Sequence, residues 1–143
     1  MTEAREPPAA DGGAPIELNA ESFTAAIARH PLAIVDFWAP WCAPCRGFAP
    51  VFEAAAARHP DILFAKVNTE DEQALAGQFG IRSIPTLMIF RDDIIVYAEA
   101  GALPAAALEQ VLAGARALDM DAVRREVDAH EAAEARNAGT GTS

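Results

Sequence analysis

The two cysteines of this 143-residue chain, Cys42 and Cys45, are separated by only two residues. A hydrophobic run typical of a strand ends just before them, and a pattern with helical spacing follows them. Two thiols at this spacing, at the start of a helix, are typical of a dithiol that converts to a disulfide and back. The motif therefore requires a strand, a turn and a helix in succession, and it predicts thiol–disulfide redox chemistry.

The predicted helix assigns a different role to each thiol. Three residues along a helix place Cys45 on the same face as Cys42, one turn further on and close enough for the sulfurs to bond. Cys42 would then lie among backbone N–H groups that have no helical partner, at the positive end of the helix dipole, which stabilises a thiolate. We expect Cys42 to be the nucleophile and Cys45 the resolving thiol.

A metal site is the alternative interpretation of the same pair. Two cysteines supply half of a four-coordinate zinc shell, and the chain has no second pair. Its histidines, His30, His59 and His130, show no ligand spacing to one another. We therefore predict no bound metal, although a zinc ion shared between two chains stays open.

Composition restricts the partners and the compartment. The length is that of one domain, and a hydrophobic content of 52% is ample for a single core. A net charge of −10 disfavours nucleic acid and anionic membranes, because both would repel the chain. The N-terminus has no pattern of a signal peptide, and no apolar run is long enough to span a bilayer. We expect a cytoplasmic protein, in which a lone cysteine pair is more often catalytic than structural.

Hydrophobic periodicity predicts an α/β fold. We expect strands over residues 16–18, 32–38, 62–67, 86–90 and 94–98, the last two joined by the short loop Arg91-Asp92-Asp93. Asn19 is expected to cap a helix to Arg29, and a capping box of Thr69 and Glu72 to open a helix to Phe79. Further helices are expected from the dithiol to Arg58, kinked at Pro50, and from Pro104 onwards. This order predicts a mixed central sheet with helices on both faces.

Asp36 is the exception in a strand that is otherwise apolar on both faces. A carboxylate is costly to bury in a sheet covered on both sides. Asp36 must therefore either be satisfied by hydrogen bonds with no part in catalysis, or be an acid whose pKa is raised by desolvation into a useful range.

The two ends of the chain lie outside this pattern. Residues 1–15 are rich in proline, alanine and glycine and are predicted to be a disordered leader. Asp119 or Asp121 can cap an additional helix to about Arg136, with Met120, Val123 and Val127 as a thin apolar stripe before a tail from Gly139. We expect domain limits of 1–15, 16–118 and 119–143, the last being a loosely docked helix or a surface for partners.

Two sequence stretches resemble the thioredoxin family. One covers residues 35–46, Val-Asp-Phe-Trp-Ala-Pro-Trp-Cys-Ala-Pro-Cys-Arg, and the other covers residues 79–86, Phe-Gly-Ile-Arg-Ser-Ile-Pro-Thr, with Gly101 later in the chain. Residues 48–50 and 66–70 are most similar to the thioredoxin 2 branch of bacteria, although the cysteine-free residues 1–15 stand where that branch has a zinc-binding segment. The resemblance implies a thioredoxin fold for residues 16–114, to which the C-terminal helix would be an addition.

The resemblance also implies a reaction. The protein would reduce disulfides of cytosolic proteins, with no bound cofactor, and thioredoxin reductase would recharge it with electrons from NADPH. Cys42 would form a mixed disulfide with the substrate, and Cys45 would resolve it. Asp36 would lie beneath Cys45 and remove its proton through water, and Lys66 would modulate the charge of Asp36. Alternatively, Lys66 only reaches solvent from its strand.

The substrate surface is implied in the same way. Pro85 would be the family's cis-proline, and the backbone before it, at Ile84, would pair with an extended substrate segment. Pro85 in an ordinary trans loop is the alternative. The apolar rim would consist of the loop from residue 80 to 86 and of Trp41, Pro44, Gly101 and Ala102.

Several residues depart from the family pattern. Ala43 replaces the usual glycine between the cysteines, where residues help to set the redox potential. Pro44 keeps the reductase character. Asp92-Asp93 replaces the frequent Asn-Gly, which predicts a different hairpin turn.

Two rival functions remain. One is a chaperone-like or scaffold module that binds a partner through the C-terminal extension, and the other is an oxidase or isomerase of an oxidising compartment. We expect a monomeric reductase, because both cysteines, Asp36 and Pro85 are present together.

Overall fold

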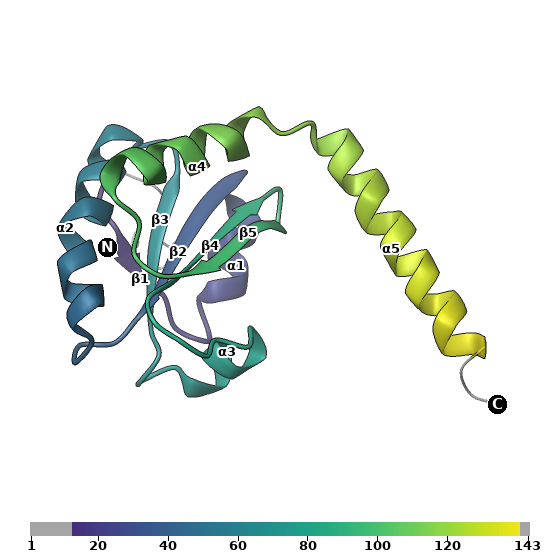
Figure 1. Cartoon of the computed structure of the whole chain (residues 1–143), viewed down its shortest axis with the longest axis horizontal. Helices are drawn as coiled ribbons and strands as arrows, with labels where there is room; N and C mark the ends of the chain where they lie inside the picture. Colours follow the sequence, from purple (N-terminus) through teal and green to yellow (C-terminus); the bar gives the residue numbers. More distant parts are fainter. Residues whose placement is uncertain (1–12, 141–143) are drawn as a thin grey trace, which may run out of the picture.

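The computed structural model describes residues 13–140 and contains the predicted alternation of strands and helices (Figure 1). Most element limits lie within a few residues of those expected from periodicity. The elements are β1 (Ile16–Glu17), α1 (Phe23–Arg29), β2 (Leu32–Trp38), α2 (Ala43–Arg58), β3 (Leu63–Asn68), α3 (Gln73–Gln78), β4 (Thr86–Arg91), β5 (Ile94–Ala100), α4 (Ala105–Ala117) and α5 (Met120–Thr140).

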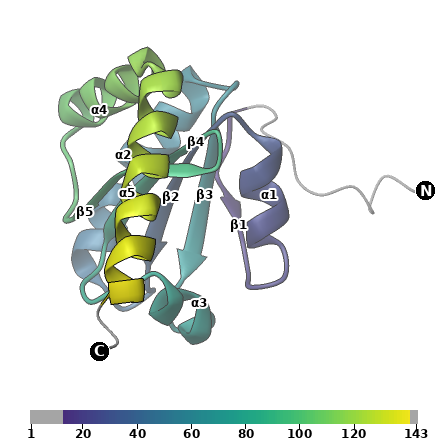
Figure 2. The same ribbon diagram turned by 90° about the vertical axis from the view of Figure 1, so that its right-hand side faces the viewer.

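The strands form one mixed sheet in the order β1-β3-β2-β4-β5. The pairs β1–β3 and β3–β2 are parallel, whereas β4 runs antiparallel to both β2 and β5. Helices α1 and α3 cover one face, and α2 and α4 cover the other (Figures 1 and 2). The prediction of a mixed sheet flanked on both sides is confirmed.

The central strand β2 supplies both hydrophobic cores. Ala33, Val35 and Phe37 belong to the core under α1 and α3, and Leu32 and Ile34 belong to the core under α2 and α4. Side chains alternate between the faces of a strand, so the sequence of β2 is apolar throughout because both faces are covered. The same alternation directs Asp36 to the α2 face, which is the face that carries the dithiol.

Helix α2 extends through Pro50 as one element. The proline ring has no N–H, so the carbonyl group four residues earlier loses its usual helical donor. The kink expected at Pro50 stays a prediction. The apolar stripe of α2 is confirmed by the complete burial of Phe52 and Ala55.

The predicted capping box of Thr69 and Glu72 does not form. The Thr69 hydroxyl donates to the carbonyl oxygen of Trp38 at 3.0 Å, and the Glu72 carboxylate accepts from the backbone N–H of Ala20 at 3.0 Å. Both side chains are thus occupied by distant segments, and α3 begins only at Gln73. The prediction from the local motif is wrong because groups distant in sequence form hydrogen bonds with the Thr69 hydroxyl and the Glu72 carboxylate.

Asn19 also acts differently from the expected helix cap. Its side-chain oxygen accepts hydrogen bonds from the backbone N–H groups of Glu21 and Ser22, both at 2.9 Å. These contacts shape a turn before the helix, and α1 begins at Phe23. Asparagine is well suited to such a turn because its side chain can hydrogen-bond to the backbone two residues further on.

The β4–β5 hairpin has the turn that Asn-Gly would form. The φ angles of Asp92 and Asp93 are 52° and 68°, and positive values at both central residues are the signature of a type I′ turn. The prediction of a different turn is therefore wrong. The twist of the paired strands selects this turn, and two aspartates adopt it at some conformational cost.

Asp93→Gly is expected to raise the free energy of unfolding by about 0.5–1 kcal/mol, because glycine adopts positive φ without a steric penalty. Urea denaturation of the oxidised protein measures this change. Asp92→Gly is the matched control, since it relieves the same strain but removes the Asp92–Arg124 ion pair of 2.8 Å. A loss of stability in Asp93→Gly would contradict the argument.

The N-terminal segment meets the body at Gly13. A Cβ atom at this residue would lie 2.7 Å from the carbonyl oxygen of Ala56 and 2.9 Å from Cα of Ala57, so only glycine fits this approach to α2. Residues 1–12 of the predicted leader lie outside the described residues. Their disorder stays a prediction.

Helix α5 projects from the body after a short connection (Figure 1). Asp119 caps it, accepting hydrogen bonds from the N–H groups of Asp121 and Ala122 at 3.1 and 3.3 Å. Met120 is buried, and the helix continues to Thr140, past the tail that Gly139 was expected to begin. None of the helices within residues 13–140 combines the length and apolar character needed to cross a bilayer.

Candidate dithiol site

Cys42 and Cys45 form a disulfide at the start of α2, with their Cα atoms 5.2 Å apart. Cys42 is the N-cap residue, and its sulfur accepts a hydrogen bond from the backbone N–H of Cys45 at 3.2 Å. Pro44 lies in the first turn, where a missing N–H costs nothing because no helical acceptor is available. The expected position of the two cysteines at a helix terminus is therefore confirmed, and the stabilisation of a Cys42 thiolate there stays a prediction.

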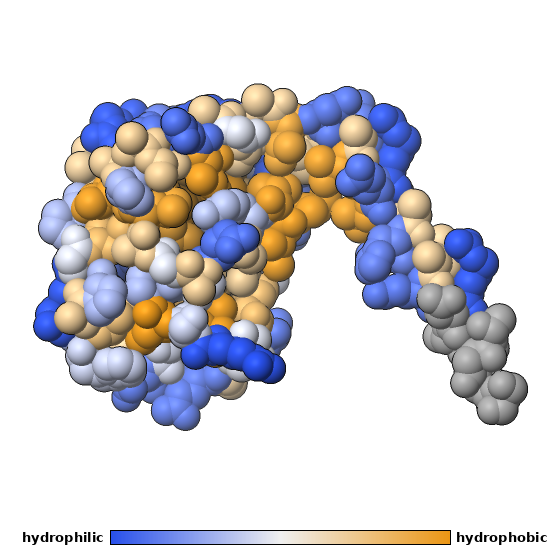
Figure 3. Space-filling view, in the orientation of Figure 1, coloured by the Kyte–Doolittle hydropathy of each residue, from blue (hydrophilic) through white to orange (hydrophobic). Residues whose placement is uncertain are grey.

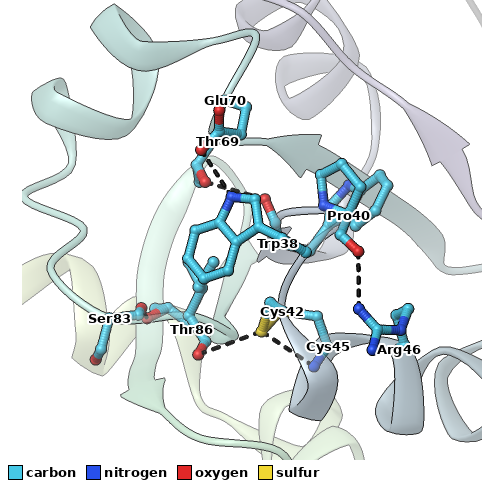
Figure 4. Close-up of a disulfide and its surroundings, with 11 residues drawn as sticks. Trp38, Pro40, Cys42, Cys45, Arg46, Thr69, Glu70, Ser83 and Thr86 are labelled. Carbon is cyan, nitrogen blue, oxygen red and sulfur yellow. Dashed lines mark hydrogen bonds between the residues drawn. A yellow bond between two sulfur atoms is a disulfide. The ribbon is translucent and has the colours of Figure 1, made fainter.

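The dithiol lies beneath an exposed apolar rim. Cys42 and Cys45 are 4% and 2% exposed and pack with Ala39, Trp38 and Ile84. Trp41, by contrast, is 64% exposed. Figure 4 shows the sulfur of Cys42 between the start of α2 and the segment that precedes Thr86. The Cys42 sulfur is therefore reached from solvent only past the residues around it.

The Ile84–Pro85 segment borders the disulfide. Its peptide bond is cis, as expected, and Pro85 is buried. The sulfur of Cys42 lies 3.7 Å from the carbonyl oxygen of Ile84. The backbone N–H of Gly101 donates to the carbonyl oxygen of Pro85 at 2.7 Å, with Gly101 at a φ of 109° that favours glycine. These contacts bring Gly101 and the exposed Ala102 toward the same rim.

Asp36 is fully buried, and both of its carboxylate oxygens lack a hydrogen-bond partner among the described residues. No described protein group satisfies the Asp36 carboxylate, so the alternative of a carboxylate satisfied by hydrogen bonds would need water. Desolvation raises the pKa of Asp36 to about 7, Lys66 opposes this effect, and Glu17 adds to it. A carboxyl group with its pKa raised this far can hold a proton near neutral pH, unlike an exposed aspartate.

Lys66 pairs with Asp36 in the register of β2 and β3. Its ammonium group lies 4.4 Å from the centre of the Trp38 ring, a favourable cation–π geometry. Because the Asp36 oxygens have no hydrogen-bond partner, Lys66 influences Asp36 through space. Its side chain is partly exposed, so it also reaches solvent.

Two contacts near the dithiol were not predicted from the sequence. The carboxylate of Glu70 accepts a hydrogen bond from the indole N–H of Trp41 at 2.7 Å and so fixes the exposed ring. Arg46 donates to the carbonyl oxygen of Pro40 at 2.9 Å and holds the loop before the cysteines (Figure 4). Parallel strands end at the same edge of a sheet, so residues that follow β2 and β3 could have been expected to meet.

Metal ligation finds no geometric support in the part of the chain that the structure describes. Residues 13–140 contain no group of three or more histidine, cysteine, aspartate or glutamate side chains that could hold an ion. The possibility of a zinc ion shared between two chains is not tested by a single chain.

A helix-terminal disulfide beside a cis-proline, on a mixed sheet covered on both faces, defines a protein of the dithiol–disulfide oxidoreductase class. The thioredoxin family model matches residues 14–114. The chain therefore belongs to the thioredoxin family, and the predicted fold and redox chemistry are confirmed.

Similar proteins agree with this assignment. A protein assigned as thioredoxin 2 from Streptomyces coelicolor is 50% identical over 117 residues, which cover 82% of this chain and 87% of that protein. Thioredoxin of Porphyra purpurea is 45% identical over 93 residues, 64% of this chain and 87% of its own length.

Solved structures extend the comparison to the fold. A single-residue mutant of thioredoxin from Halobacterium salinarum has a TM-score of 0.71 and 28% identity, covering 78% of this chain and 98% of its own. Thioredoxin f of spinach chloroplast has a TM-score of 0.69 and 28% identity, and the match covers 76% of this chain and 91% of that protein.

Proposed function

We propose that this protein is a monomeric cytoplasmic reductase of protein disulfides that receives electrons from NADPH through thioredoxin reductase. The observation that carries the proposal is the Cys42–Cys45 disulfide at the start of α2, next to the Ile84–Pro85 segment. No bound cofactor is needed, because the two thiols themselves carry the two electrons.

Cys42 would begin the reaction as a thiolate. It attacks one sulfur of the substrate disulfide, forming a mixed disulfide and releasing the other substrate sulfur as a thiolate. Unpaired N–H groups and the helix dipole at the start of α2 stabilise the attacking form of Cys42. Its low exposure restricts the reaction to disulfides that fit over the rim.

Cys45 would complete the reaction. Its thiolate attacks the Cys42 sulfur, which releases the reduced substrate and closes the Cys42–Cys45 disulfide. Asp36 accepts the Cys45 proton through a water molecule, and its pKa of about 7 suits this transfer at neutral pH. The positive charge of Lys66 stabilises the Asp36 carboxylate when Asp36 has lost its proton.

The substrate would lie across the exposed rim. An extended segment can pair with the backbone at Ile84, in the manner of a strand added to a sheet, while Pro85 shapes the surface next to the sulfur. Trp41, Pro44, Gly101 and Ala102 are exposed around it and supply apolar contact. The hydrogen bond from Trp41 to Glu70 supports this role, because it holds the ring in place before binding.

The reduction potential of the Cys42–Cys45 pair tests the direction of the reaction. A value near that of thioredoxin, about −270 mV, together with NADPH-dependent insulin reduction in the presence of thioredoxin reductase, would support the proposal. A value near that of protein disulfide isomerase, about −180 mV, would instead indicate an oxidant or isomerase. Sedimentation of the purified protein tests the monomeric state.

A second candidate function is an interaction module that uses residues 119–143 as an extension of the domain 16–118. A groove of about 500 Å³ lies between β5 and α5, and Figure 3 shows hydrophobic residues along this concave side. Ile94, Ile95 and Val96 line it from β5, and Val123 and Val127 line it from α5.

Charge points to the occupant of this groove. Glu126, Glu131 and Glu134 border the apolar lining. A second copy of this chain, with its net charge of −10, would be repelled, whereas a basic amphipathic segment of another protein would be attracted. We therefore assign such a segment as the partner in this second function.

Deleting residues 119–143 is expected to leave insulin reduction within about twofold of the full chain, since the dithiol lies in the preceding domain, and to abolish binding of a synthetic leucine–lysine amphipathic peptide. Fluorescence anisotropy of the labelled peptide measures binding. Val127→Asp in the full chain is the matched single substitution, and a leucine–glutamate peptide is the charge control. Equal binding of the lysine peptide to the shortened chain would overturn the second function.

A further inference from the structure

Three charged side chains form a line across the sheet. Glu17 of β1 pairs with Lys66 of β3, and Lys66 pairs with Asp36 of β2. Residues paired in register across neighbouring strands project from the same face, and neighbouring strands are about 4.8 Å apart. The line therefore runs from an exposed carboxylate at the sheet edge to the buried carboxyl group on the face that carries the dithiol.

Lys66 occupies the middle of this line. Trp38 lies two residues after Asp36 on the same face of β2. The Lys66 ammonium nitrogen lies over the Trp38 ring, 4.4 Å from its centre. In the strand register Lys66 thus stands between Glu17 and Asp36, and its ammonium group does not hydrogen-bond to the buried carboxylate. Any group that attracts Lys66 toward the edge weakens its effect on Asp36.

A pocket of about 260 Å³ opens at the edge end of the line. Glu17, Trp38 and Asp71 are among its lining residues. The indole N–H of Trp38 is buried and has no hydrogen-bond partner among the described residues. A polar pocket of this volume holds several water molecules, which can hydrogen-bond to these groups. Solvent thus reaches the outer end of the charged line.

We propose that Glu17 is a positioning residue of the dithiol site, which attracts Lys66 toward the sheet edge and thereby controls proton exchange at Asp36. The inference rests on the proposed role of Asp36 as the proton acceptor for Cys45. From the sequence, Glu17 was predicted only to belong to a short strand.

The charges near Asp36 act on its pKa in the directions that the proposal requires. Asp36 is influenced by Lys66 from β3 and by Glu17 from β1, while β4 contributes the apolar Leu87. Helix α2, which carries the dithiol, packs on the same face of the sheet. Lys66 lowers the pKa of Asp36 and Glu17 raises it. Removing the Glu17 charge ends this repulsion and also frees Lys66 to act on Asp36, so both effects lower the Asp36 pKa.

The pKa of Glu17 is likewise set by opposing influences. Desolvation raises its pKa, and Lys66 is the largest opposing influence. The Trp38 indole also lowers it, although this indole N–H lies outside hydrogen-bonding geometry, and Asp71 raises it. Lys66 thus stabilises the charged forms of both carboxylates, as expected of a shared cation.

Carboxyl ¹³C NMR of the oxidised protein tests the proposal directly, because the cysteines do not titrate in the disulfide. Glu17→Gln is expected to lower the pKa of Asp36 by about 0.5 to 1, as charges roughly 10 Å apart would at a protein surface. Glu17→Asp, which keeps the charge, is expected to retain most of the original pKa. An unchanged Asp36 pKa in Glu17→Gln would overturn the proposal.

Glu99→Gln is the matched control. Glu99 pairs with Leu87, which pairs with Asp36, so Glu99 lies on the same line of residues at the opposite edge of the sheet. Its removal eliminates one charge at a similar number of strand spacings from Asp36 without affecting Lys66, so the Asp36 pKa is expected to fall less than in Glu17→Gln. An equal shift in Glu99→Gln would show that any lost charge suffices and would contradict a specific role for Glu17.

The pH dependence of insulin reduction separates this inference from the proposed function. If Asp36 accepts the Cys45 proton, the rate of insulin reduction rises with pH as Asp36 loses its proton. In Glu17→Gln this rise is then expected at a lower pH, because the Asp36 pKa is lower. A shifted Asp36 pKa with an unmoved profile would support the role of Glu17 toward Asp36 and refute Asp36 as the proton acceptor. In a Lys66→Gln background, the Glu17→Gln shift is expected to become smaller; an undiminished shift would refute action through Lys66.

Discussion

Cys42→Ser is expected to lower disulfide reduction to the uncatalysed rate, whereas Cys45→Ser is expected to stop the reaction after its first step. Without the Cys42 sulfur, no mixed disulfide with the substrate can form at the helix terminus. Without the Cys45 sulfur, the mixed disulfide forms but nothing resolves it. Non-reducing electrophoresis and intact mass measurement with a disulfide substrate detect this covalent complex, and insulin reduction measures turnover.

Ala43→Gly is the control for this pair, since it changes the segment between the cysteines and keeps both sulfurs. It is expected to turn over insulin repeatedly and to accumulate no covalent complex. A complex that accumulates in Cys42→Ser rather than Cys45→Ser would reverse the assigned order of attack. Normal turnover by either serine variant would refute the two-thiol mechanism.

Asp36→Asn is expected to raise the free energy of unfolding by about 4 kcal/mol near pH 8 and to change it little near pH 4. Desolvation raises the pKa of Asp36 from 3.8 to about 7, and each tenfold change in proton affinity corresponds to about 1.4 kcal/mol. Between these two pKa values the folded state binds more protons than the unfolded state, so stability falls as pH rises. Asparagine has nearly the same shape and carries no charge, so it avoids this loss.

Urea denaturation of the oxidised proteins at several pH values measures the difference. Asp128→Asn, at an exposed position of α5, is the control and is expected to follow the wild-type pH dependence. A stability difference between Asp36→Asn and wild type that is the same at all pH values would show that Asp36 does not titrate near neutrality.

The same substitution is expected to slow insulin reduction by at least about tenfold near pH 7, because Cys45 loses its proton acceptor. The deficit is expected to narrow as the pH approaches the pKa of the Cys45 thiol, where the thiolate forms without assistance. A gain in stability combined with a loss of activity is typical of a residue kept for function.

Much of this fold follows from local patterns in the sequence. The apolar run of residues 32–38 predicted a central strand, and β2 has these limits because both of its faces are covered. Helical spacing predicted the buried positions of α2 and α4. The short loop at Asp92-Asp93 required antiparallel strands, although the strand twist, rather than the residue types, selected the turn.

Local patterns failed where a side chain had a choice of partners. Thr69 and Glu72 have the spacing of a capping box, but their hydrogen bonds go to Trp38 and Ala20 instead. The contact between Trp41 and Glu70 joins the ends of β2 and β3, and neither residue alone indicates it. A polar side chain takes the partner that the packed sheet brings near, and that partner depends on contacts distant in sequence.

The sequence by itself determined the dithiol, because a spacing of three residues at a helix terminus brings Cys42 and Cys45 together and stabilises the thiolate of the first. It also determined that Asp36 would be buried, since its strand is apolar on both sides. Only the tertiary structure decided what surrounds that carboxyl group. The register of β1, β3 and β2 aligned Glu17, Lys66 and Asp36, and such alignment arises only when three separate segments pair in one sheet.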